Sequence, residues 1–149
     1  MTKHPFVPAD FEVPTGLETE QFRLRMLTVH DVEKDYEAVM ETRERLFAID
    51  GNWPREGFTM EENLADLQRH QREFLERVAF AYTVVSLDES RVLGCVYINK
   101  VKHKSVDAWV HMWVRESEYQ KGLDPILFKT VKEWIETSWP FEKVIYPRR

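Results

Sequence analysis

The run VLGCVYI at residues 92–98 is the feature that most limits what this chain can fold into. It holds no charged side chain, and near-continuous apolar runs of this length are typical of strands buried on both faces. The preceding run AFAYTVVS, residues 79–86, is rich in β-branched and aromatic residues, and residues 87–90 are turn-like. The two runs therefore predict a hairpin inside a sheet that is covered on both sides.

The remaining elements follow from the spacing of apolar residues. Residues 108–114 alternate in the manner of a strand, as do residues 22–26, and FEKVIY at residues 141–146 indicates a last strand. Helical spacing predicts three helices, within residues 31–50, 59–78 and 123–138. The expected order is β-α-α-β-β-β-α-β, an α+β fold of three layers. Its central sheet is mostly antiparallel, with a parallel crossover at the end.

Residues 1–17 contain three prolines and are expected to form an irregular arm, followed by a single domain over residues 18–149. The only cysteine is Cys95, so an intrachain disulfide is excluded; nothing in the sequence suggests a zinc site, and no metal is expected. A net charge of -5 with dispersed basic residues argues against nucleic-acid binding. Neither a secretion signal nor an 18-residue apolar run is present, so we expect a cytoplasmic protein without a membrane partner.

Three stretches resemble the GNAT superfamily of acyl-CoA-dependent N-acetyltransferases. LETEQFRLRMLTVHDVEKDY resembles the first strand and helix of that family, and VVSLDESRVLGCVYI its second and third strands. WVHMWVRESEYQKGLDPILFKTVKEWI resembles its fourth strand and cofactor-binding helix. The resemblance implies acetyl-CoA as co-substrate, held by backbone groups of the fourth strand and by the turn before the helix. The implied cofactor-binding residues are Met112, Trp113, Val114, Tyr119, Gln120, Lys121, Gly122, Leu123 and Asp124.

The turn before that helix departs from the family pattern, which reads Arg/Gln-x-x-Gly-x-Gly/Ala. Counted from Gly122, this chain keeps one of the three signature positions; alternatively Gln120 is the first position and the turn is one residue short. Asp124 followed by Pro125 predicts the N-cap and first residue of the helix. The Asp124 carboxylate would then bind the amides that a pyrophosphate needs, with Lys121 compensating in part.

The family usually continues past its fifth strand with a further helix and strands, whereas this chain ends at Arg149. The resemblance therefore implies that a neighbouring subunit completes the sheet, or that the acid which protonates the leaving thiolate is missing. Because the last strand would otherwise present an open edge, we expect a homodimer.

For catalysis, His111 lies on the predicted fourth strand and has a suitable ordinary pKa for accepting the proton of an amine; a packing role between two tryptophans is the alternative. Asp107 and Glu116, near the two ends of that strand, could act through water, although solvated charges are common at such positions. Trp53 and Trp109 are candidates for the wall of an acceptor pocket, and core packing is the alternative for Trp109.

Two functions remain open from the sequence. The first is transfer of an acetyl group from acetyl-CoA to a primary amine of a small molecule or peptide. The alternative is a non-catalytic GNAT-like module that binds a ligand or a partner and has lost the pyrophosphate loop.

Overall fold

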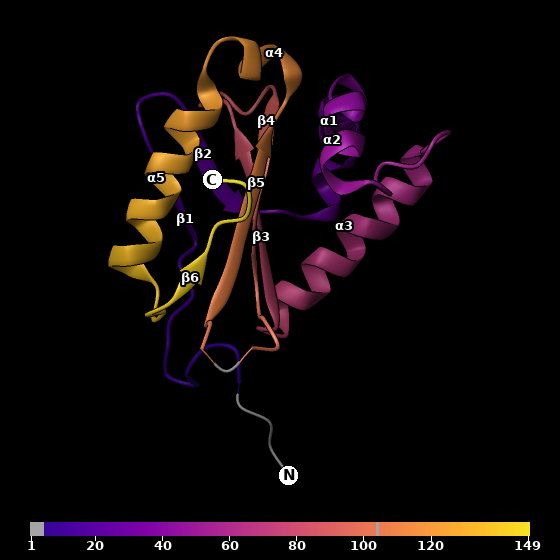
Figure 1. Cartoon of the computed structure of the whole chain (residues 1–149). Coiled ribbons are helices and arrows are strands. Elements are labelled where there is room, and N and C mark those ends of the chain that lie inside the picture. The colour runs from indigo at the N-terminus through magenta and orange to yellow at the C-terminus, as the bar shows by residue number, and fades with distance from the viewer. Residues whose placement is uncertain (1–4, 104) are drawn as a thin grey trace.

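A computed structural model describes residues 5–103 and 105–149; residues 1–4 of the expected arm lie outside the described part. One sheet of six strands runs in the order β1-β2-β3-β4-β5-β6. Figure 1 shows α1, α2 and α3 on one face of this sheet and α5 on the other. The strands are β1 (Gly16–Glu18), β2 (Arg23–Met26), β3 (Ala79–Val85), β4 (Val92–Asn99), β5 (Ala108–Val114) and β6 (Val144–Ile145). The helices are η1 (Val29–Asp31), α1 (Val32–Glu41), α2 (Arg43–Asp50), α3 (Met60–Leu75), α4 (Glu116–Gln120) and α5 (Leu123–Ser138).

The predicted three-layer arrangement is confirmed, with antiparallel pairing from β1 to β5 and parallel pairing between β5 and β6. The buried side chains form two clusters, one on each face of the sheet. The first lies beneath α5 and includes Tyr82, Ile98 and Leu127. The second lies beneath α1, α2 and α3 and includes Val39, Leu67 and Cys95. The apolar run at residues 92–98 is thus buried from both sides, as its composition predicts.

Several boundaries differ from the sequence prediction. The irregular arm ends before Gly16, because residues 16–18 pair with β2. The first helix breaks at Thr42, whose hydroxyl accepts the N–H of Glu116 (2.9 Å) and donates to the carbonyl of Ala38 (2.7 Å). A short helix, α4, precedes the turn before α5, where the sequence predicted no helix. The predicted helix within residues 59–78 begins at Met60, after a capping box formed by Thr59 and Glu62.

Arg115 fastens α1 to the end of β5. Its buried guanidinium donates to Glu41 (2.8 Å), to Glu37 (3.0 Å) and to the carbonyl of Val92 (3.0 Å). The hydrogen bond from Arg115 holds the pKa of Glu41 down to about 2. These contacts fix the distance between α1 and the sheet at the C-terminal end of β5.

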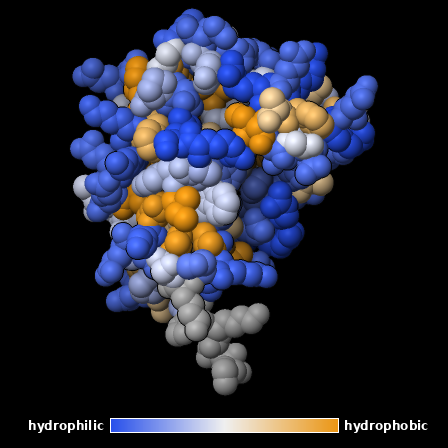
Figure 2. All heavy atoms as spheres, in the orientation of Figure 1, coloured by the Kyte–Doolittle hydropathy of each residue, from blue (hydrophilic) through white to orange (hydrophobic). Residues whose placement is uncertain are grey.

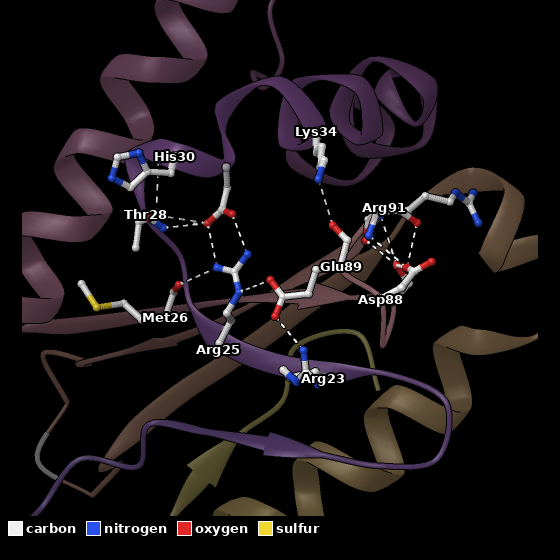
Figure 3. Close-up of polar contacts among 12 residues, drawn as sticks. Arg23, Arg25, Met26, Thr28, His30, Lys34, Asp88, Glu89 and Arg91 are labelled. Carbon is white, nitrogen blue, oxygen red and sulfur yellow. Dashed lines mark hydrogen bonds and ion pairs between the residues drawn. The ribbon is translucent and has the colours of Figure 1, made fainter.

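A second cluster of charges fastens the other end of α1 (Figure 3). Arg25 on β2 donates to both carboxylate oxygens of Asp31 (2.8 and 3.1 Å), and Glu89 of the β3–β4 turn accepts from Arg25 (2.9 Å) and Arg23 (2.7 Å). Lys34 on α1 donates to the carbonyl of Glu89 (2.9 Å). The β2 strand, the β3–β4 turn and the start of α1 are therefore tied together.

The surface seen in Figure 2 is mainly hydrophilic, with apolar side chains gathered in small patches. Within residues 5–103 and 105–149, no helix is both long enough and apolar enough to span a membrane.

The Asp31 carboxylate is the part of the charge cluster whose loss should cost most. It is buried and also accepts the N–H of Thr28 (2.9 Å), so Asp31→Ala removes one of the two carboxylates that bind Arg25 and leaves the Thr28 N–H without its acceptor. We expect the free energy of unfolding in urea to fall by about 2 kcal/mol. Glu18→Ala, which removes an exposed partner of Arg23, is the control and should change it little. Equal losses in the two variants would contradict this view of the cluster.

Candidate functional site

A cavity of about 660 Å³ lies on the α1–α3 face of the sheet, beside β4 and β5. Its deep end is formed by side chains of α1 and α3, and its mouth by α4, the start of α5 and residues 147–149. Its lining includes Leu27, Asp35, Arg45, Leu46, Asp50, Trp53, Asn63, Asp66, Leu67, His70, Tyr97, Trp109, His111, Met112, Trp113, Val114, Tyr119, Asp124, Arg148 and Arg149.

The outer edge of β5 is open next to this cavity. The N–H of Arg115 donates to Leu93 on β4 (2.7 Å), and successive N–H groups of a strand point to opposite edges. The N–H groups of Met112 and Val114 consequently point away from β4, toward β6. Since β6 pairs with β5 at Ala108 and Trp109, the two groups lie beyond its reach, in the gap between the diverging strands. The N–H of Trp113 points to β4, so Trp113 offers its ring rather than its backbone donor.

The first turn of α5 faces the same gap. Gly122 is the N-cap, with a left-handed φ of +88°, and the helix begins at Leu123. The prediction that Asp124 caps the helix is wrong. Because glycine takes the left-handed conformation needed after α4, the helix starts two residues earlier than expected. Asp124 and Pro125 become its second and third residues, where a missing N–H costs no intrahelical hydrogen bond.

The Asp124 carboxylate is engaged by arginine instead of by backbone amides. Arg149 donates to both of its oxygens, one at 3.0 Å, and its guanidinium lies 5.0 Å from the ring centre of Phe128. Arg148 donates to the carbonyl of Ile49 on α2 (3.2 Å). Residues 147–149 therefore cross the mouth between α2 and α5, and Figure 1 shows this segment passing in front of β5. The N–H groups of Leu123 and Asp124 have no hydrogen-bond acceptor among the described residues.

At the deep end of the cavity, α1 places a buried carboxyl group. Asp35 is 4% exposed and accepts a hydrogen bond from the Asn63 amide of α3 (3.0 Å). Burial raises its pKa to about 7, because water can no longer solvate the charged form; the Asn63 hydrogen bond opposes the rise. Sequence reasoning missed Asp35, since a polar residue within a helix pattern is normally assigned to the solvent side.

His111 lies beside the cavity and stacks on Tyr97, with ring centres 4.7 Å apart. His70 of α3 lies on the same tyrosine at 5.4 Å. Burial lowers the pKa of each histidine to about 4, and nearby arginines add to the effect, so both rings are neutral at neutral pH. The Tyr97 hydroxyl accepts a hydrogen bond from the Trp113 indole (3.0 Å), which completes a packed aromatic wall.

The structure brings the predicted pocket tryptophans to this wall. Trp53 lies against Trp113, with ring centres 6.5 Å apart, and both line the cavity. Trp109 also lines the cavity but is 42% exposed, so core packing does not account for it. Tyr119 lines the mouth beneath the Arg45 guanidinium, which lies 3.5 Å from its ring centre.

Four further residues predicted for the site do not line the cavity; they are Asp107, Glu116, Gln120 and Lys121. Asp107 accepts the N–H groups of Glu142 (2.7 Å) and Lys143 (2.9 Å), and so fixes the loop before β6. Glu116 forms a two-point ion pair with Arg45 and accepts from Gln120 (2.6 Å). Lys121 is exposed, 3.7 Å from Glu118. The two carboxylates thus have structural partners and are not among the residues that line the cavity.

Within the described residues no group of three or more His, Cys, Asp or Glu side chains could hold a metal ion. Cys95 is buried in the core, as expected from its apolar strand.

Comparison with known proteins gives likeness in fold. No protein-family model and no curated protein matches the sequence. Ribosomal-protein-S5-alanine acetyltransferase from Vibrio fischeri superposes with a TM-score of 0.73 at 20% identity, covering 91% of this chain and 76% of that one. The RimL ribosomal L7/L12 alpha-N-protein acetyltransferase in complex with coenzyme A superposes with a TM-score of 0.63 at 18% identity, covering 81% of this chain and 66% of that one. The microcin C7 self-immunity acetyltransferase MccE with acetyl-CoA and AMP superposes with a TM-score of 0.65 at 13% identity, covering 85% of this chain and 70% of that one. The fold class predicted from the sequence is confirmed, and the chain spans about two thirds to three quarters of these proteins.

The buried Asp35 carboxyl makes stability depend on pH. Its folded pKa lies above the ordinary value of 3.8, so its favourable contribution is present at acid pH and is lost as pH rises through 7. We expect Asp35→Asn, a neutral isostere, to raise the free energy of unfolding at about pH 8 by about 2 to 4 kcal/mol, with little change at about pH 4. Asp10→Asn, at an exposed position, is the matched control for urea denaturation at both pH values. A stability gain that does not vary with pH would contradict the burial of the charge.

Proposed function

We propose that this chain, which has the GNAT acyl-CoA N-acyltransferase fold, transfers an acetyl group from acetyl-CoA to a primary amine. The observation that carries the proposal is the open edge of β5 between an aromatic-lined cavity and the first turn of α5. The N–H groups of Met112 and Val114 face that gap, where they can bind the pantetheine arm and polarise a thioester carbonyl. The related fold of MccE is known with acetyl-CoA bound, and that of RimL with coenzyme A.

The pyrophosphate would lie on the N–H groups of Leu123 and Asp124, at the positive end of the α5 dipole. Asp124 brings a negative charge to this position, and Arg149 neutralises it. Gly122 leaves open space at the turn, since no atom lies within 4 Å of where a Cβ would be. Tyr119, Gln120 and Lys121 border this turn, with Lys121 as an exposed cation for the phosphates.

At the other end of the gap, Trp53, Trp109 and Trp113 offer a wall for the acceptor. His111 is a candidate for proton transfer because its ring lines the same cavity. Its low pKa makes it a neutral hydrogen-bond acceptor but a weak base.

The non-catalytic alternative is not favoured. It rested in part on the C-terminal elements that the family usually has, and in part on Asp124 occupying the amides of the first turn, whereas that carboxylate pairs with Arg149. The neighbours in fold are, in addition, acetyltransferases. The amine could belong to a small molecule, or to a protein as in the ribosomal-protein acetyltransferases. A homodimer joined at the β6 edge and a cytoplasmic location stay predictions.

Calorimetric titration with acetyl-CoA, followed by mass spectrometry of a panel of amines and N-terminal peptides, tests the function. We expect micromolar binding of acetyl-CoA and a mass gain of one acetyl group on at least one amine. Acetyl-pantetheine, which lacks the pyrophosphate, should bind more weakly. Absence of binding at millimolar acetyl-CoA would overturn the proposal.

The charges at the first turn of α5 give a sharper prediction. Asp124→Asn removes a negative charge and should tighten acetyl-CoA binding about threefold to tenfold, whereas Arg149→Gln should weaken it to a similar extent. Neither change should affect acetyl-pantetheine, which carries no phosphate. Equal effects on the two ligands would place the phosphates elsewhere.

A further inference from the structure

Two carboxylates of the cavity have a cationic partner: Asp124 pairs with Arg149, and Asp66 lies 3.9 Å from Arg69. The exposed Asp50 carboxylate accepts the N–H of Asn52 (3.2 Å), whereas Asp35 is only 4% exposed. In the part of the chain that the structure describes, the partner of Asp35 is the neutral amide of Asn63. Burying a carboxylate without a cation costs free energy, so the position of Asp35 on the cavity wall favours a positively charged occupant.

The groups packed around Asp35 do not supply that charge. Those that affect its pKa are Asp31 of η1 together with Asn63 and Asp66 of α3. Its charge is also felt by Cys95 and Tyr97 of β4, which are neutral because burial raises the pKa of each. None of these groups is a cation, and the charges of Asp31 and Asp66 favour entry of a cation over entry of an anion.

The walls beside Asp35 are apolar and aromatic. Leu27, Leu46 and Leu67 line the cavity and are nearly inaccessible, while Trp53 and Tyr97 form its aromatic side. A site of this kind suits an ammonium group carried on an apolar stem, because the rings attract cations and pack against hydrocarbon.

We propose that Asp35 binds the ammonium group of the acceptor and takes its proton, and that the acceptor is a primary amine on an apolar stem. The inference rests on the proposed acetyl transfer and deepens it. It makes Asp35 a catalytic residue and Asn63 a positioning residue.

Acetyl transfer begins with deprotonation of the acceptor. The R–NH3⁺ group gives one proton to the Asp35 carboxylate, directly or through one water, and leaves R–NH2 with a free electron pair. That pair forms the C–N bond to the thioester carbonyl carbon, and the C–S bond breaks. The departing thiolate takes the second proton from nitrogen, which yields the amide and the thiol of CoA. Asp35 then releases its proton to solvent.

The pKa of about 7 suits this exchange at neutral pH, and it exceeds that of His111. Above this value Asp35 is charged and attracts the ammonium group; as pH falls toward 6 it becomes neutral and the attraction is lost. The amine itself stays protonated across this range.

A matched pair of probes isolates the charge. Phenethylamine and 2-phenylethanol have the same stem, and binding of each can be followed by the fluorescence of Trp53 and Trp113 without acetyl-CoA. At about pH 8 the wild-type protein should prefer the amine by at least about tenfold, and the preference should fade as pH approaches 6. Asp35→Asn should bind both probes alike at every pH, while Asp10→Asn should behave as wild type. Asn63→Ala should move the midpoint to higher pH, because the Asn63 hydrogen bond lowers the pKa of Asp35.

Acetyl transfer to phenethylamine gives the second readout, and a short N-terminal peptide with an apolar first residue shows whether peptides share the site. Asp35→Asn should lower kcat by about 100-fold at about pH 8 while the KM for acetyl-CoA stays within twofold. His111→Gln should retain more activity than Asp35→Asn. Since Asp35→Asn is expected to be more stable than the wild type at this pH, unfolding cannot explain the loss.

An amine preference that survives in Asp35→Asn, or turnover within threefold of wild type, overturns the inference and leaves the acetyltransferase function intact. The reverse result is an amine preference that depends on Asp35 in a protein that binds no acetyl-CoA. This result would support the amine site and overturn the proposed acetyltransferase function.

Discussion

The unequal use of the two edges of β5 is the constraint on which the rest of this structure depends. One edge pairs with β4 along six residues, from Trp109 to Val114, while the other pairs with β6 at two. The N–H groups of Met112 and Val114 therefore lie beside the cavity without a strand partner, although the N–H groups inside a sheet are normally hydrogen-bonded. A ligand with carbonyl and amide groups along its length is the chemical complement of such an edge.

The cavity beside that edge persists because both ends of α1 are fastened by ion pairs. At one end Arg25 and Asp31 join β2 to η1; at the other, Arg115 binds Glu41. With its ends held, the middle of α1 can keep Asp35 out of water, and the energy of those contacts offsets the cost of burying an ionisable group. Burial raises the pKa of Asp35 to about 7, so the charged form of this carboxyl lowers the stability of the fold at alkaline pH.

The sequence predicted the sheet well because its strands carry unambiguous patterns. The apolar run at residues 92–98 and the alternation at 108–114 left little choice of architecture. The first turn of α5 was misjudged because Asp124 followed by Pro125 is a strong local signal. A left-handed Gly122 and the distant Arg149 overrode it. Asp35 could not be found from the pattern, since its partner Asn63 lies 28 residues away and its burial arises from the packing of α1 on α3 and β4.

A crystal structure of the protein with acetyl-CoA would show whether the open edge of β5 holds the co-substrate. We predict that the thioester arm lies along β5, with its carbonyl oxygens at hydrogen-bond distance from the N–H groups of Met112 and Val114. The pyrophosphate should contact the N–H groups of Leu123 and Asp124, and the acetyl group should point into the cavity that holds Asp35. Acetyl-CoA bound at another surface, or an unchanged gap at saturating ligand, would contradict this prediction.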